Sequence, residues 1–255
     1  MPAKNSEQLA LPGRWNRPLQ SRWRSQGVCT IRSMHTLSQL RSGQLQGIRR
    51  LDLSAGLSTF PREIFDLADT LEVLNLSGNA LTTLPDDLPR LLRLRVIFCS
   101  GNRFTELPAI LGQCAQLEMV GFKSCQIRSV PAAALPPRLR WLILTDNHIR
   151  TLPAEIGQCQ QLQKLMLAGN QLQHLPPALA QCQALELLRI SANPMADAAD
   201  LPGWLLHLPR LSWLARAGTP HIDPLGRSHL LDRLGAATAP GRRRLRRDPP
   251  GPVAR

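Results

Sequence analysis

Apolar and polar positions repeat along this chain with a period of 23 residues. Aligning LEVLNLSGNALTTLP (71–85) with LQKLMLAGNQLQHLP (162–176) shows the pattern most clearly. Equivalent units open at leucines 71, 94, 117, 139, 162 and 185, with a shorter unit before them at Ile48 and a degraded one after them at Leu211. A repeat of this length predicts a stack of similar coils, because a single coil cannot bury its own apolar face.

Within each unit, the LxL segment alternates in the manner of a short β-strand, so its two leucines point inward and the residues between them point outward. Leu74 with Leu76, Leu142 with Leu144 and Leu165 with Leu167 are the inward pairs of three units. A second apolar pair follows the turn, and a proline then ends the extended segment because it has no amide hydrogen for a ladder. Stacked coils would pair these strands in parallel.

The motif LxxLxLxxNxL followed by LP resembles the leucine-rich-repeat family, in its 23-residue intracellular type, over residues 48–215. The resemblance implies an α/β solenoid with parallel strands on a concave face and short helices, 3₁₀ turns and extended segments on the convex face. It also implies that one aligned set of asparagines forms a ladder between coils, in which side-chain amides satisfy buried backbone groups: Asn79, Asn102, Asn147, Asn170 and Asn193. Cys125 replaces the asparagine in one unit, where we expect a weaker ladder or a thiol hydrogen bond.

Outward strand positions on the concave face are free of the constraints of the core, so they carry the information about function. They form a continuous apolar patch, and such a patch typically marks an interface. We therefore predict a protein-binding surface made of Val73, Val96, Phe98, Met119, Trp141, Ile143, Met166, Leu187 and Arg189. Trp141 is the expected anchor, since tryptophan is enriched at binding hot spots. The alternative is that these residues pack against a terminal segment of the same chain.

The net charge of +13 lies mostly at the two ends of the chain. Residues 1–33 carry +5 and residues 216–255 carry +6, which leaves +2 for the repeats. Composition predicts that residues 1–33 are a disordered basic leader, with Met34 as the natural start, and that residues 34–47 form a capping helix. Residues 216–255 read as a basic Pro/Arg-rich disordered tail, in which Thr219 and His221 replace the ladder asparagine and an apolar residue.

Catalytic and metal-binding motifs are missing from the sequence. The six cysteines form no CxxC pair, the histidines form no HExxH motif, and there is no GxSxG elbow or Walker loop. Cys114, Cys159 and Cys182 occupy a leucine position of the repeat and are expected to be core residues. We therefore predict a non-enzymatic, cytoplasmic, monomeric protein with no cofactor and no metal. No apolar run is long enough for a transmembrane helix.

Two alternative functions stay open at this point. The repeats also resemble the leading part of bacterial leucine-rich-repeat protein-kinase-like proteins, through WLILTDNHIRTLPAEIG and the segment that follows it. The GxGxxG, VAIK, HRD and DFG motifs of a kinase are missing, so this reading implies a regulator whose catalytic domain is lost. The second alternative is nucleic-acid or membrane-surface binding by the arginine-rich tail, which lacks interleaved aromatic residues.

Overall fold

The computed structural model describes residues 34–195 and 202–216. This range contains the whole repeat tract apart from one short segment. The predicted basic leader, Thr219, His221 and nearly all of the predicted arginine-rich tail lie outside the described residues.

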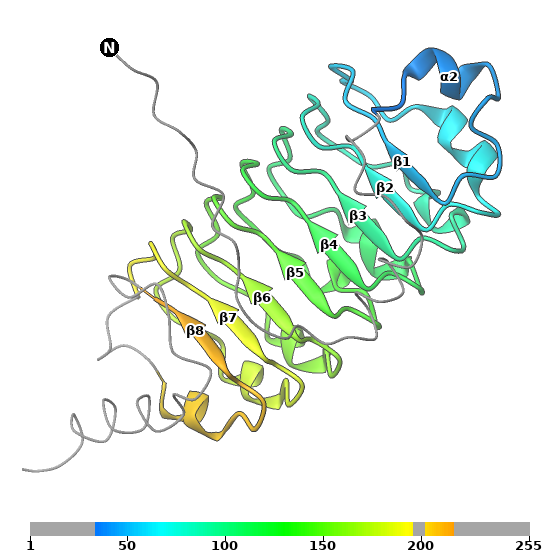
Figure 1. Cartoon of the computed structure of the whole chain (residues 1–255). Coiled ribbons are helices and arrows are strands. Elements are labelled where there is room, and N and C mark those ends of the chain that lie inside the picture. Colours follow the sequence, from blue (N-terminus) through cyan, green and yellow to red (C-terminus); the bar gives the residue numbers. More distant parts are fainter. Residues whose placement is uncertain (1–33, 196–201, 217–255) are drawn as a thin grey trace, which may run out of the picture. The chain divides into compact units, whose positions relative to one another are not determined.

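Eight parallel strands, one from each coil, form a single open sheet in which every strand pairs with the next one along the chain (Figure 1). Each strand is three residues long and falls on the predicted LxL segment, so the strand prediction is confirmed. The strands are β1 (Arg50–Asp52), β2 (Val73–Asn75), β3 (Val96–Phe98), β4 (Met119–Gly121), β5 (Trp141–Ile143), β6 (Lys164–Met166), β7 (Leu187–Arg189) and β8 (Trp213–Ala215).

Short 3₁₀ helices line the opposite side of the coils (Figure 1). They are η1 (Arg62–Leu67), η2 (Leu88–Arg90), η3 (Ala109–Gln113), η4 (Ala132–Ala134), η5 (Ala154–Gln158), η6 (Pro177–Gln181) and η8 (Gly203–His207). A proline in extended conformation immediately precedes all of these except η2. The fixed φ of proline thus ends the extended segment and starts the turn.

The space between the sheet and the 3₁₀ helices is filled by one continuous apolar core. Leu74, Leu142 and Leu165, the central residues of three strands, have no exposed surface. The same core runs from Leu40 to Leu214, so no coil buries its leucines alone. The predicted solenoid is confirmed, and burial of this shared apolar surface supplies the main driving force for stacking.

The asparagine ladder connects the coils through a repeated set of hydrogen bonds. Asn170 is typical: its Nδ2 donates to the carbonyls of Leu144 and Leu167 at 2.9 Å each, and its Oδ1 accepts from the amide of Ile149 at 3.0 Å. The other four asparagines make the same three kinds of bond. Each amide therefore satisfies groups of two adjacent coils, as the resemblance implied.

Cys125 interrupts this ladder between Asn102 and Asn147. Its thiol donates to the carbonyl of Cys99, with 3.4 Å between sulfur and oxygen, and lies 3.7 Å from the carbonyl oxygen of Lys123. A thiol is a weak donor with one hydrogen, whereas an asparagine amide supplies two hydrogens and a strong acceptor. The expected thiol hydrogen bond is present.

The predicted capping helix is shorter than its expected range of 34–47. Helix α2 (Leu37–Arg41) is capped at its N-terminus by Thr36 in a capping box, in which the side chains of Thr36 and Gln39 accept hydrogen bonds from each other's backbone amides. The helix ends at Arg41 with Ser42 as its C-cap, because Gly43 follows at a φ of +74°, a conformation that glycine adopts without strain. Leu40 and Leu45 are nevertheless buried against the first coil, as the apolar pattern indicated.

Candidate interaction surface

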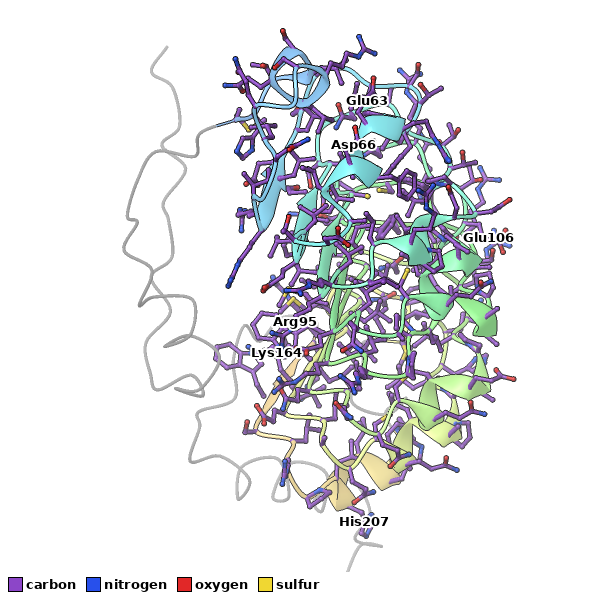
Figure 2. All side chains as sticks on the ribbon, turned by 90° about the vertical axis from the view of Figure 1, so that its right-hand side faces the viewer. Glu63, Asp66, Arg95, Glu106, Lys164 and His207 are labelled. Atoms are coloured by element: carbon purple, nitrogen blue, oxygen red, sulfur yellow. The ribbon has the colours of Figure 1, made fainter. Side chains whose placement is uncertain are left out.

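Two rows of outward side chains cross the sheet, one residue from each strand. The pairing register places the first residues of all strands in one row and the third residues in another. We call these the first row and the third row, and the sheet side that carries them the strand face. Figure 2 shows Arg95 and Lys164 on this side, whereas Glu63 and His207 lie on the side of the 3₁₀ helices.

The third row contains an apolar stretch that is half-buried and ends at a charged residue. Phe98, Gly121, Ile143, Met166 and Arg189 are direct neighbours on successive strands. Phe98, Ile143 and Met166 are half-buried, and Arg189 is exposed. A Cβ added to Gly121 would lie 2.5 Å from Cδ1 of Phe98. The Phe98 ring therefore covers Gly121, and the apolar stretch is continuous from β3 to β6.

The first row is less accessible than the third row. Val73, Val96 and Leu187 are only 3%, 8% and 8% exposed, while Met119 and Trp141 are half-buried. The alternation of the sequence placed both rows on the outward face without ranking their accessibility. The difference depends on the packing of neighbouring side chains, which the repeat pattern does not encode.

Trp141, the predicted anchor, is held by a neighbouring lysine. The Nζ atom of Lys164 lies 3.6 Å from the centroid of the Trp141 ring, which is cation–π geometry. Lys164 is only 8% exposed. Burial lowers the pKa of its ammonium group, and the negative charge of Glu186 partly counteracts that effect. The lysine fixes one face of the indole, so a ligand would meet the remaining surface of Trp141.

A row of alternating charges borders the first row, and our reading of the sequence missed it. Glu118 bridges two arginines: its carboxylate lies 2.6 Å from Arg95 and 3.8 Å from Arg140. One coil further toward β1, Arg49 lies 3.8 Å from Glu72. The signal was present in the sequence, since the residue immediately before each strand alternates in sign through most of the repeats. Because these charges are paired with one another, they add little net charge to the strand face.

A cluster of polar side chains lies at the β1 end of the strand face. Arg50 binds Asp52 through two hydrogen bonds of 2.6 and 2.8 Å, and Asn75 donates to the same carboxylate at 2.8 Å. Burial alone would raise the pKa of Asp52, but the hydrogen bonds from Arg50 and Asn75 outweigh it, so the pKa lies below its usual value. The carboxylate is thus already satisfied within the fold.

The described residues hold no group of three or more His, Cys, Asp or Glu side chains that could bind a metal ion. Cys114, Cys159 and Cys182 are buried free thiols, as expected for residues in a leucine position. Burial raises the pKa of Cys114 and Cys159 to about 11 and that of Cys182 to about 12. These thiols are therefore protonated near neutral pH, and a thiol is a poor nucleophile.

Comparison with protein families and solved structures agrees with this architecture. Family models described as leucine-rich repeat match residues 137–195 and residues 70–91. No curated protein matches the sequence at a significant level. Together with the register of the strands and the asparagine ladder, the family matches show that the chain carries leucine-rich repeats stacked as a solenoid.

Three solved structures illustrate the likeness. A leucine-rich-repeat protein of Leptospira interrogans is 29% identical with a TM-score of 0.52, and the match covers 66% of this chain and 48% of that one. The ectodomain of the Arabidopsis thaliana membrane receptor kinase GASSHO1/SCHENGEN3 is also 29% identical with a TM-score of 0.57, covering 70% and 22%. An internalin of Listeria monocytogenes, at 20% identity, a TM-score of 0.55 and coverage of 71% and 50%, shares the fold alone.

The chain thus spans half or less of the length of these solved proteins. No enzyme family is indicated by the comparisons. None of the helices in the described part of the chain has the length and apolar character of a membrane-spanning segment.

Proposed function

We propose that the strand face binds a segment of a protein partner, and that this chain is a recognition module. The proposed contact residues are the nine predicted from the sequence: Val73, Val96, Phe98, Met119, Trp141, Ile143, Met166, Leu187 and Arg189. The half-buried and exposed members of this set contact the partner. The buried members, Val73, Val96 and Leu187, pack beside them in the sheet and hold them in place. The observation behind the proposal is the half-buried apolar stretch across β3 to β6, which the core does not need.

A polypeptide fits this face better than a nucleic acid does. Nucleic-acid binding depends on arginines and lysines that are free to contact phosphates. On the strand face, Arg50, Arg95 and Arg140 are engaged with carboxylates, and Lys164 lies against Trp141. Exposed apolar and aromatic side chains bordered by charged residues are instead typical of protein interfaces.

The solved neighbours support a recognition role. The Arabidopsis receptor kinase ectodomain was solved in complex with CASPARIAN STRIP INTEGRITY FACTOR 2, so a related solenoid binds another gene product. We further propose that this chain works inside the cell, in signalling. The five described cysteines, all free thiols, support a reducing compartment. A regulator that combines such repeats with a kinase domain is the second candidate, favoured by the same neighbour, and would use the same face.

Replacement of the anchor tests the proposal. Tagged full-length chain, its Trp141→Ala variant and a Leu92→Ala control are used to capture partners from native lysate. Leu92 is 71% exposed and lies outside the strands, so it matches the loss of apolar surface without touching the strand face. Loss of a hot-spot tryptophan costs about 2 kcal/mol or more, so Trp141→Ala should weaken capture roughly 30-fold.

The control should capture the same partner as the wild type, and circular dichroism verifies that all three proteins are folded. Equal capture by Trp141→Ala and wild type would show that the interface lies elsewhere. A deletion of residues 241–255 completes the design. If that deletion alone abolished capture, the arginine-rich tail and not the strand face would be the binding element.

A further inference from the structure

We infer that the occupant of the strand face is an amphipathic helix of the partner, with an acidic residue that contacts Arg189. The helix would run across the strands along the third row, with three apolar side chains on Phe98, Ile143 and Met166. This inference rests on the proposed function and specifies the chemistry of the ligand.

The spacing of the row favours a helix over an extended segment. Neighbouring strands lie about 4.8 Å apart, so the row presents one side chain at each such interval. Successive turns of a helix are about 5.4 Å apart, whereas alternate residues of an extended chain are about 6.7 Å apart. Over the three steps from Gly121 on β4, where the edge of the Phe98 ring lies, to Arg189 on β7, these repeats cover about 14, 16 and 20 Å, respectively. A helix therefore stays in step with the row, and an extended chain slips by more than one strand.

The Phe98 ring over Gly121 fixes where the helix can lie. Any side chain at position 121 would displace this ring, because its Cβ would approach to 2.5 Å of Cδ1 and 3.0 Å of Cε1 of Phe98. Glycine thus lets one aromatic ring cover two strands and produces a smooth apolar surface. On a helix, residues i, i+4 and i+7 form one stripe that spans two turns, so they would contact the edge of the Phe98 ring over Gly121, then Ile143, then Met166, on three successive strands.

Charge sets which end of the apolar stripe carries the acidic residue. Arg189 follows Met166 in the register and is exposed. Within the described ranges, no hydrogen bond or ion pair involves its side chain. At the opposite end of the same row, Asp52 is neutralised by Arg50 and bonded by Asn75. The end at β7 is therefore the one that attracts an unpaired carboxylate. The negative C-terminal end of the helix dipole also favours that end, so the carboxylate belongs at position i+11, one turn beyond the apolar stripe.

Two display libraries test this inference on the full-length chain. The first is an alanine- and glutamine-rich helical peptide randomised at positions i, i+4, i+7 and i+11. The second is a peptide held extended by flanking prolines and randomised at alternate positions. The helical library should yield binders with apolar residues at the first three positions and Asp or Glu at the fourth. The affinity of the best peptide is then measured by fluorescence anisotropy.

Charge reversal separates the role of Arg189 from general electrostatics. Arg189→Glu should weaken that peptide about tenfold, because it removes an attraction and adds a repulsion. The effect should shrink in 1 M salt, where charges are screened. Arg128→Glu makes the same change of net charge at an exposed arginine outside the strands and should leave the affinity unchanged.

Three results would overturn the inference. Binders drawn only from the extended library would refute the helix but leave the proposed function standing, provided that Ile143→Asp abolishes them. Helical binders without an acidic preference at i+11, or insensitive to Arg189→Glu, would refute the role of Arg189. Failure of both libraries, or binders that a folded Ile143→Asp variant still accepts, would refute the inference and the proposed binding face together.

Discussion

Removing one rung of the asparagine ladder should destabilise the solenoid far more than removing an equivalent side chain outside the ladder. The side chain of Asn170 is buried, at 6% exposure, and makes three hydrogen bonds of 2.9 to 3.0 Å to backbone groups. Asn170→Ala leaves the amide of Ile149 and the carbonyls of Leu144 and Leu167 without these partners. At about 1 kcal/mol or more for each buried group left unsatisfied, the free energy of unfolding should fall by roughly 3 kcal/mol or more.

The matched control is Asn75→Ala, the same substitution on the strand face. Asn75 is half-buried and bonds only the Asp52 side chain and one nearby amide. Water can replace those bonds, so we expect a loss of about 1 kcal/mol or less. Urea unfolding followed by circular dichroism gives the two free energies. Hydrogen exchange adds a local readout, because the amide of Ile149 should lose protection in Asn170→Ala alone. Equal losses in the two variants would refute the ladder as a source of stability.

Three further changes test separate parts of the account. Cys125→Asn restores a full rung and should raise the urea midpoint by the equivalent of about 1 kcal/mol; an unchanged or lower midpoint would contradict the weakness assigned to this coil. Gly157→Ala places a Cβ 2.5 Å from the carbonyl oxygen of Ala178 and should cost about 1–3 kcal/mol, whereas Gly203→Ala has open space and should cost much less. Because the folded pKa of Asp52 is lowered, its contribution is complete above the unfolded value of about 3.9 and is lost as the pH falls through the folded value. The difference in urea midpoint between wild type and Asp52→Asn should therefore be smaller at pH 3 than at pH 7. An equal difference at the two pH values would disprove this linkage.

The 23-residue pattern was sufficient to predict most of the fold. Strand positions, inward leucines, the asparagine ladder and the buried cysteines all follow from residues that recur in register, because each coil repeats the same local contacts. Helix α2 shows the limit of this reasoning: its apolar residues were identified, but Gly43 ends the helix well before the predicted boundary. A local backbone conformation overrides the apolar pattern there.

The candidate site could be predicted only as a set of outward positions. Which of these positions remain accessible depends on side-chain conformations that differ from coil to coil. The Lys164 ammonium over Trp141 and the Phe98 ring over Gly121 both involve neighbours 23 residues apart, and the repeat pattern alone does not show which pairs make contact. The alternating charges around Glu118 could be identified in the sequence. Only the structure shows that they form ion pairs with one another across neighbouring coils.

Site-specific crosslinking tests most directly the central claim that the strand face recognises a protein. A benzophenone amino acid is placed at position 143, in the middle of the third row, or at position 92, which is exposed and outside the strands. Irradiation in native lysate should give a discrete adduct from position 143 that excess unlabelled wild-type chain competes away and that position 92 does not give. The account would be contradicted if only the position 92 variant formed adducts. It would also be contradicted if the position 143 variant formed no adduct that unlabelled wild-type chain competes away.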